Sequence, residues 1–205
     1  ILLNLSEDHL DRHGFLGDYA SLKERIFARQ GPEDYAVVNM DDQLIRTMTP
    51  SIHAKVVGFG RRGYRPPGVC IEERYLSFCP EPGREEMYPL GWVKLMGLHN
   101  RENMAAVLAA GRLMKCPPER IMEAMEKFTG LEHRLEWVRQ INGVDYYNDS
   151  KATNIAATVR ALESFSRPVI LLAGGKTKGD DITPLRLAAL KCVRQLILFG
   201  EARHL

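Results

Sequence analysis

The chain has 205 residues, which is long enough for one large domain or two small ones. Hydrophobic residues make up 45% and charged residues 26%, values typical of a globular protein that dissolves in water. The net charge of +2 gives no basic footprint for nucleic acid, and no apolar run is long enough to span a membrane. The four cysteines lack the spacing of a metal site, so we expect reduced thiols and a cytoplasmic location.

The first part of the chain mixes strands and helices, as judged from the spacing of apolar residues. We expect strands at residues 1–5, 35–38, 54–59, 69–78 and 92–96. We expect helices at residues 18–30, 104–116 and 119–128. A glycine, Gly130, ends this helical run, so residues 1–130 are predicted to form one domain and residues 131–205 a second.

Strands and helices alternate regularly in the second predicted domain. An Asn142-Gly143 turn joins two short strands between residues 135 and 147. The elements expected after them are a helix at 155–165, a strand at 168–173, a helix at 185–192 and a strand at 195–199. This order predicts an α/β fold with a parallel sheet and right-handed crossovers.

The most informative stretch is residues 147–154, Tyr-Asn-Asp-Ser-Lys-Ala-Thr-Asn, called the octet below. It separates a predicted strand from a predicted helix. Such a junction directs backbone N–H groups and small hydroxyls at a ligand, and the helix dipole favours an anion there. The alternative is a capped helix start with solvated charges, because Ser, Thr, Asn and Asp are ordinary N-cap residues.

Two further positions near the N-terminus have side chains suited to chemistry. Two histidines and three acidic residues lie between Glu7 and His13, a combination that suits a divalent cation or a proton transfer, or else a polar loop that caps the next helix. Lys23 leans toward the apolar face of the helix predicted at residues 18–30. A lysine held partly out of water can act as a nucleophile, although a side chain that snorkels past the apolar stripe is the commoner case.

Asn100 and Asn103 lie three residues apart at the start of a predicted helix, and therefore on one face. Two amides on one face can clasp a ligand with both donors and acceptors. If Asn100 is instead the N-cap, that explains one asparagine but not the second.

Residues 174–179 contain Gly-Lys-Thr after an apolar strand, which suggests a phosphate-binding P-loop. The P-loop pattern requires glycine four residues before this tripeptide, and Ile170 occupies that position. The segment is therefore not a P-loop. It is still a doubly basic loop at the carboxyl end of a strand, where we expect it to contact an anion.

Three motifs together resemble the Mur ligase family in order and spacing: Asp-His-Leu-Asp-Arg-His-Gly at 8–14, His-Asn-Arg-Glu-Asn at 99–103, and Gly-Leu-Glu-His-Arg at 130–134 leading into the octet. The resemblance covers nearly the whole chain and is weakest at about residues 40–88. It implies part of a central ATPase domain at 1–130, followed by part of a Rossmann-like C-terminal, amino-acid-binding domain at 131–205.

The activity that this resemblance implies is ATP-dependent amide-bond formation through an acyl phosphate. The octet is similar to that of family members that add D-glutamate to UDP-N-acetylmuramoyl-L-alanine during peptidoglycan precursor synthesis. Members that add other amino acids, and folylpolyglutamate synthetases, have different residues there. The implied cofactors are ATP and Mg²⁺, and the implied oligomeric state is a monomer.

The resemblance also assigns roles to individual residues. His9 matches a histidine that ligates a catalytic magnesium ion, and Lys23 matches a lysine whose carbamate supplies an oxygen to a second one. The residues that match nucleotide contacts are Asn100, Asn103, Arg134 and Asp149. The residues that match the cradle for the D-glutamate carboxylates are Lys151, Thr153 and Lys178, and Lys151 is also counted with the catalytic residues His9 and Lys23.

The sequence also departs from the family pattern. It has no domain for the UDP moiety, no P-loop and no glutamate ligand for magnesium, all of which precede the position of Ile1 in the family. We therefore expect a fragment, unable by itself to hydrolyse ATP. The alternatives are a catalytically silent nucleotide- or amino-acid-binding module of the same fold, or another ligase of the Mur or folylpolyglutamate type, which the octet disfavours.

Overall fold

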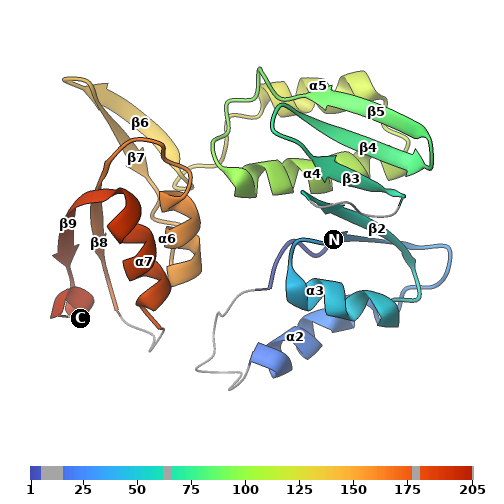
Figure 1. The fold of residues 1–205 in the computed structure, drawn as a ribbon, viewed down its shortest axis with the longest axis horizontal. Coiled ribbons are helices and arrows are strands. Elements are labelled where there is room, and N and C mark those ends of the chain that lie inside the picture. Colours follow the sequence, from blue (N-terminus) through green and yellow to red (C-terminus); the bar gives the residue numbers. More distant parts are fainter. Residues whose placement is uncertain (6–15, 62–65, 177–180, 205) are drawn as a thin grey trace. The chain divides into compact units, whose positions relative to one another are not determined.

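The computed structural model describes residues 1–5, 16–61, 66–176 and 181–204 (Figure 1). The described residues form two compact units: those up to Thr129 belong to unit 1, and those from Gly130 onward belong to unit 2. No helix in the described ranges has the length and apolar character needed to cross a membrane.

Unit 1 is built on a five-stranded sheet in the order β1-β2-β3-β4-β5. These strands are β1 Tyr35–Asn39, β2 Lys55–Gly60, β3 Gly68–Ile71, β4 Tyr75–Glu81 and β5 Arg84–Pro89. The first three strands run parallel, and β4 runs antiparallel to both of its neighbours, β3 and β5. The strand expected at residues 1–5 is reduced to one bridge, in which the Leu2 N–H donates to the Val37 carbonyl at 2.9 Å.

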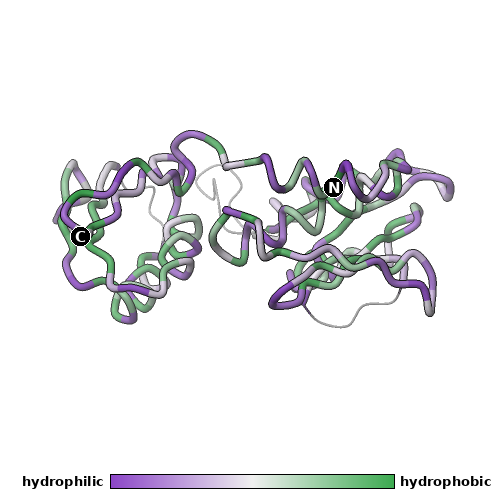
Figure 2. The backbone as a smooth tube through the Cα atoms, turned by 90° about the horizontal axis from the view of Figure 1, so that it is seen from above, coloured by the Kyte–Doolittle hydropathy of each residue, from purple (hydrophilic) through white to green (hydrophobic). Residues whose placement is uncertain are grey.

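Helices accompany this sheet and form two hydrophobic cores with it. The helical elements are α2 Leu16–Glu24, η1 Arg25–Phe27, α3 Gln43–Met48, η2 Thr49–Ser51, α4 Leu98–Leu113 and α5 Pro118–Lys127. Alternate residues of β1 serve different cores, because successive side chains of a strand point to opposite faces. Val37 joins the core formed with α4 and α5, whereas Ala36 and Val38 join the core formed with α2 and α3. Hydrophobic and hydrophilic stretches are interspersed along the backbone (Figure 2).

Two expectations for unit 1 were wrong. The stretch at residues 69–78 is not one strand, because the chain reverses after β3 and the Glu72 N–H donates to the Tyr75 carbonyl at 3.0 Å. Residues 92–96, which were expected to form a strand, form none, and the strand that follows β4 in the sheet is β5. The run Arg84-Glu85-Glu86 conceals the alternation of β5, in which Tyr88 is fully buried. Helix α3 was not predicted.

Unit 2 begins with the β-hairpin of β6 Glu136–Ile141 and β7 Val144–Asn148. Asn142 and Gly143 form its loop with φ of 49° and 78°, as a two-residue type I′ turn requires. The elements that follow are α6 Ile155–Leu162, β8 Val169–Gly174, α7 Thr183–Cys192, β9 Val193–Phe199 and η3 Glu201–His204. Strands β8 and β9 pair in parallel, as predicted, and α6 packs against α7.

Candidate functional site

The octet lies where the sequence predicted, between the end of β7 and the start of α6. Its last residue, Asn154, caps α6, because its Oδ1 accepts a hydrogen bond from the Ala157 N–H at 2.8 Å. Its first residue, Tyr147, packs edge-on against Phe165, with ring centroids 5.0 Å apart. The capping interpretation therefore holds for Asn154, while the residues between these two anchors need another explanation.

Tight turns fold the middle of the octet and use its backbone donors. The Ala152 N–H donates to the Asp149 carbonyl at 2.8 Å, and the Thr153 N–H donates to the Lys151 carbonyl at 2.9 Å. The side chains of Lys151 and Thr153 remain exposed. An ammonium and a hydroxyl presented from one short loop can both donate hydrogen bonds to a carboxylate.

A second segment, residues 133–135, lies against the octet. The Lys151 N–H donates to the His133 carbonyl at 2.9 Å, and the Leu135 N–H donates to Asp149 Oδ1 at 2.9 Å. His133 and Leu135 have φ of 64° and 45°, a conformation that is uncommon outside glycine. These bonds bring Arg134 into the same loop cluster as Asp149 and Lys151, although the bonded residues Leu135 and Asp149 are 14 positions apart in the sequence.

In unit 1, Asn100 and Asn103 both lie in the first two turns of α4 and are half-buried. The residue that precedes the helix is Gly97, with φ of 90°, so Asn100 is not the N-cap. Its amide instead donates to the Met96 carbonyl at 2.6 Å. The capping alternative is therefore wrong, and the spacing that places both amides on one side of the helix is confirmed.

Lys23 lies in the last turn of α2. It is exposed, and its ammonium lies 5.1 Å from the centroid of the Tyr19 ring, so the expected shielding from water is not observed. His9 and Lys178 lie outside the described residues. Within the described part of the chain, no group of three or more His, Cys, Asp or Glu side chains is arranged to hold a metal ion.

At the start of the glycine-rich loop after β8, the backbone of Gly174 lies close to the end of β9 at Phe199. A Cβ on Gly174 would lie 2.1 Å from the Phe199 carbonyl oxygen, so only glycine fits there. In the same loop, the ammonium of Lys176 lies 3.5 Å from Glu201 Oε1. Because both side chains are exposed, this ion pair contributes little to stability. Lys176 therefore remains able to meet an anion.

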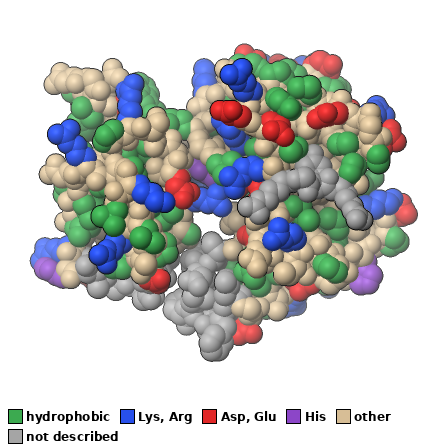
Figure 3. Space-filling model, in the orientation of Figure 1, with side chains coloured by type: hydrophobic (Ala, Val, Ile, Leu, Met, Phe, Trp, Pro, Cys, Tyr) green, Lys and Arg blue, Asp and Glu red, His purple; other side chains and the backbone are tan. Residues whose placement is uncertain are grey.

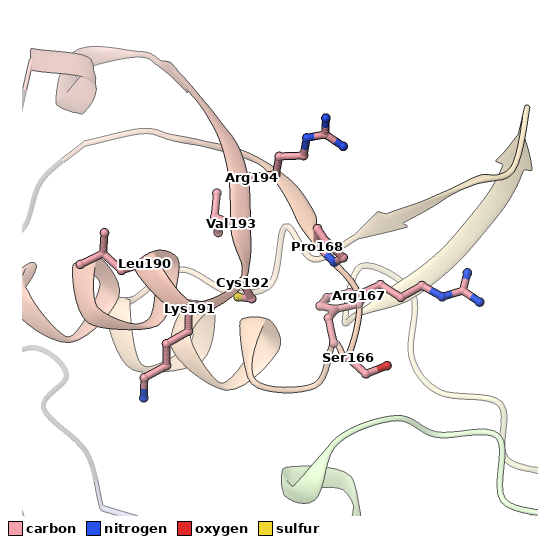
Figure 4. A pocket seen from close by; sticks show the side chains of 9 residues that line it. Ser166, Arg167, Pro168, Leu190, Lys191, Cys192, Val193 and Arg194 are labelled. Atoms are coloured by element: carbon pink, nitrogen blue, oxygen red, sulfur yellow. The ribbon is translucent and has the colours of Figure 1, made fainter.

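A shallow hollow of about 400 Å³ opens where β8 and β9 begin. It is lined by Phe165, Ser166, Arg167, Pro168, Leu190, Lys191, Cys192, Val193 and Arg194. Figure 4 shows that its three cationic side chains point away from one another. The residues that line the hollow follow the C-terminal end of α6, whereas Lys151 and Thr153 precede its N-terminal end. Phe165, which packs against Tyr147 of the octet, also lines the hollow.

Two family models match the chain. The model for the Mur ligase middle domain matches residues 1–111, and the model for the Mur ligase, glutamate ligase domain matches residues 133–205. The first match alone covers more than half of the chain, and it includes all the strands of the sheet in unit 1. The chain belongs to the Mur ligase family, as its motifs suggested.

Curated relatives narrow the similarity to one branch of that family. The UDP-N-acetylmuramoylalanine--D-glutamate ligase of Geotalea uraniireducens (strain Rf4) is 42% identical over 204 residues, and that of Pelobacter propionicus is 43% identical over 201 residues. The alignments cover 100% and 98% of this chain but 45% of each relative. The chain therefore spans less than half the length of these relatives.

Solved structures share the fold at much lower identity. MurF from Acinetobacter baumannii has a TM-score of 0.76 at 18% identity, covering 97% of this chain and 46% of that chain. MurF from Thermotoga maritima has a TM-score of 0.66 at 14% identity, covering 98% and 52%. FolC from E. coli has a TM-score of 0.64 at 18% identity, covering 95% and 45%. The predicted α/β fold class is confirmed.

Proposed function

We propose that this chain is part of an ATP-dependent ligase that joins D-glutamate to UDP-N-acetylmuramoyl-L-alanine. The octet carries this proposal, because it presents Lys151 and Thr153 from a loop that is fixed at both ends. D-Glutamate has two carboxylates, and a cationic donor beside a neutral donor suits such a ligand. The names of the curated relatives at about 40% identity point to the same amino acid.

The proposed reaction proceeds in two steps. The terminal phosphoryl group of ATP passes to the carboxylate of UDP-N-acetylmuramoyl-L-alanine, which releases ADP and forms an acyl phosphate. The amine of D-glutamate then attacks the acyl carbon, and inorganic phosphate leaves as the amide bond forms. Lys151, Thr153 and Lys178 would hold the D-glutamate carboxylates, so that the amine meets the acyl carbon in a productive orientation.

Four residues are proposed as contacts of the nucleotide. Asn100 and Asn103 would contact the adenine and ribose sides, Asp149 the ribose, and Arg134 the phosphates. The amides of the two asparagines offer the mixed donors and acceptors that a purine requires, and the exposed guanidinium of Arg134 suits phosphate oxygens. The related Thermotoga maritima MurF and E. coli FolC structures are both complexes with ADP, which supports a nucleotide site in this family.

Magnesium, when bound, would neutralise charge on the transferred phosphoryl group. His9 and a carbamylated Lys23 are its proposed ligands. Their support is the match of both residues to the family motif. The assignment of residues 1–130 to a central ATP-binding domain and of 131–205 to a C-terminal amino-acid-binding domain is part of the same proposal, as are a cytoplasmic location and a monomeric state.

The test uses the complete ligase that contains this chain. Phosphate release is followed with ATP, magnesium and UDP-N-acetylmuramoyl-L-alanine, and with D-glutamate, L-alanine or meso-diaminopimelate added in turn. Release that depends on D-glutamate alone is the expected result. Release with another amino acid would place the chain in another branch of the family, and no release would favour a silent binding module. The 205-residue chain alone is expected to show no magnesium-dependent ATPase activity.

Variants of the octet sharpen this test. Lys151→Ala is expected to raise the KM for D-glutamate by roughly 10- to 100-fold, the loss of about 1.5–3 kcal/mol from one hydrogen bond to a charged group. Lys191→Ala, which removes a cation from the hollow at the other end of α6, is the matched control and should leave this KM unchanged. Equal effects of the two substitutions would contradict the role of Lys151.

A further inference from the structure

The side chain of His133 makes a contact that the proposed function does not use. Its Nδ1 lies 2.8 Å from Nδ2 of Asn148, the second residue of the octet. We propose that His133 is a positioning residue that holds the octet against residues 133–135 by accepting a hydrogen bond from the Asn148 amide. The catalytic consequence rests on the proposed function, whereas the hydrogen bond itself does not.

The neighbours of Asn148 determine which atom donates. The Ser150 N–H donates to Asn148 Oδ1 at 3.1 Å, which identifies that atom as the carbonyl oxygen. The NH₂ group therefore faces His133, and Nδ1 must be the unprotonated acceptor. The ring proton then resides on Nε2. Hydrogen bonds of this kind commonly select one tautomer of histidine.

A neighbouring carboxylate does not compete for this ring nitrogen. Glu136 Oε2 lies 3.7 Å from His133 Nδ1, which is too long for a hydrogen bond. The same oxygen instead accepts the backbone N–H of His133 at 2.8 Å. The carboxylate of Glu136 thus holds the main chain of His133 and leaves the ring to Asn148.

The backbones on both sides of this contact present the proposed ligand-binding side chains. The His133 carbonyl accepts from the Lys151 N–H, and Asp149 Oδ1 accepts from the N–H of Leu135. With the ring contact, hydrogen bonds join residues 133–135 to residues 148–151 at three points. Loss of the ring contact frees Asn148 and loosens Asp149 and Lys151, and a displacement of about 1 Å in a reacting geometry can cost about 100-fold in rate.

The backbone of His133 supplies matched variants. Its positive φ is tolerated by glycine and, among other residues, best by asparagine. His133→Gly accepts the conformation but removes the acceptor. His133→Asn accepts the conformation and places a carbonyl oxygen, Oδ1, where Nδ1 was. The two variants therefore differ chiefly in whether Asn148 keeps its acceptor.

The first measurement reads the tautomer in the complete ligase labelled with ¹⁵N-histidine. Long-range ¹H–¹⁵N correlation spectra should show a ring that carries its proton on Nε2 alone at neutral pH, and this signal should disappear in His133→Asn. A ring protonated on Nδ1 would overturn the proposal. This result does not depend on any activity, so it stands or falls separately from the proposed ligase reaction.

The second measurement is steady-state kinetics with D-glutamate. His133→Gly is expected to lower kcat/KM by at least 10-fold, and His133→Asn should recover most of that loss. Equal activity of the two variants would overturn the positioning role. Unfolding midpoints of the two variants are measured in parallel and are expected to be similar. A lower midpoint for His133→Gly would show that its loss of kcat/KM comes from reduced stability, which would overturn the positioning role.

Discussion

Units 1 and 2 hold their candidate site residues by different physical means. In unit 1, Asn100 and Asn103 lie on α4, a helix that buries Met104 and Leu108 in the larger core. In unit 2, the buried hydrophobic residues of the described chain are Leu162 and Ala188. The octet is instead held by hydrogen bonds to residues 133–135 and by the cap of α6.

The exposed hydrophobic residues show the same contrast. Ile170, Leu172, Ile197 and Phe199 lie along one face of the β8–β9 pair and are all exposed, Leu172 to 64%. Hydrophobic side chains are accordingly visible on the surface of unit 2 (Figure 3). The contrast between the two units indicates that a polar loop can be held in place without a large hydrophobic core beneath it, provided that its own hydrogen bonds are satisfied.

The two tryptophans allow each unit to be followed separately. Trp92 belongs to unit 1 and Trp137 to unit 2. In Trp137→Phe, fluorescence reports on unit 1, and in Trp92→Phe it reports on unit 2. Urea unfolding in these two backgrounds provides the free energies of unfolding for the comparisons that follow.

The largest effect is expected in the core of unit 1. Leu108 is fully buried, so Leu108→Ala should lower the free energy of unfolding of unit 1 by about 3 kcal/mol through lost contacts and a cavity. Val107→Ala, at the neighbouring and largely exposed position of α4, is the control and should change it by about 0.5 kcal/mol or less. Similar losses for both would mean that α4 is not packed as described.

A smaller effect is expected from the ion pair that joins β5 to α4. Glu86 accepts hydrogen bonds from Arg112 at 2.7 and 2.8 Å and from the Tyr88 hydroxyl at 2.8 Å. Because the pair is only partly buried, Glu86→Gln should cost about 1–2 kcal/mol at pH 7. The matched control is Glu123→Gln on α5, whose exposed ion pairs should contribute less.

The contribution of Glu86 should also depend on pH. The hydrogen bonds from Arg112 hold the pKa of Glu86 below its ordinary value of 4.5. The unfolded state therefore binds the proton more readily, and the stabilisation is complete above pH 4.5 and is lost as pH falls through the folded-state pKa. The gap between wild type and Glu86→Gln should shrink in acid. A gap independent of pH would show that packing, not charge, causes it.

In unit 2, the cap of α6 should have a measurable effect of its own. Asn154→Ala removes the acceptor for the Ala157 N–H and should cost about 1 kcal/mol. Asn154→Ser keeps a side-chain acceptor and should recover most of this loss. If both variants lose the same amount of unfolding free energy, Asn154 stabilises unit 2 through packing rather than as a cap.

The smallest effect is expected on the exposed face of unit 2. Leu172→Thr should change the free energy of unfolding of unit 2 by about 0.5 kcal/mol or less, because the side chain is largely in water before and after unfolding. Leu162→Ala, in the small core of the same unit, is the positive control and should cause a clearly larger loss. A large loss for Leu172→Thr would show that this face is covered.

Much of the fold and part of the site could be predicted because the signals are local. The alternation of strands and helices in unit 2, the Asn142-Gly143 turn and the octet as a strand-to-helix junction all depend on residues that are neighbours in the chain. The failures in unit 1 have equally specific causes. Charged residues conceal the pattern of β5, and Gly97 starts α4 earlier than Asn100 suggested.

The sequence by itself determined the family, the position of the octet and the shared face of Asn100 and Asn103, because periodicity and motif spacing are properties of contiguous residues. Only the tertiary structure decided that His133 meets Asn148, and that Leu135 and Lys151 bond across to the facing segment. Those contacts form at the open end of the β6–β7 hairpin, where the end of β7 lies beside the start of β6. The partner of a polar side chain there depends on the path of the backbone, which includes positive φ angles at residues other than glycine.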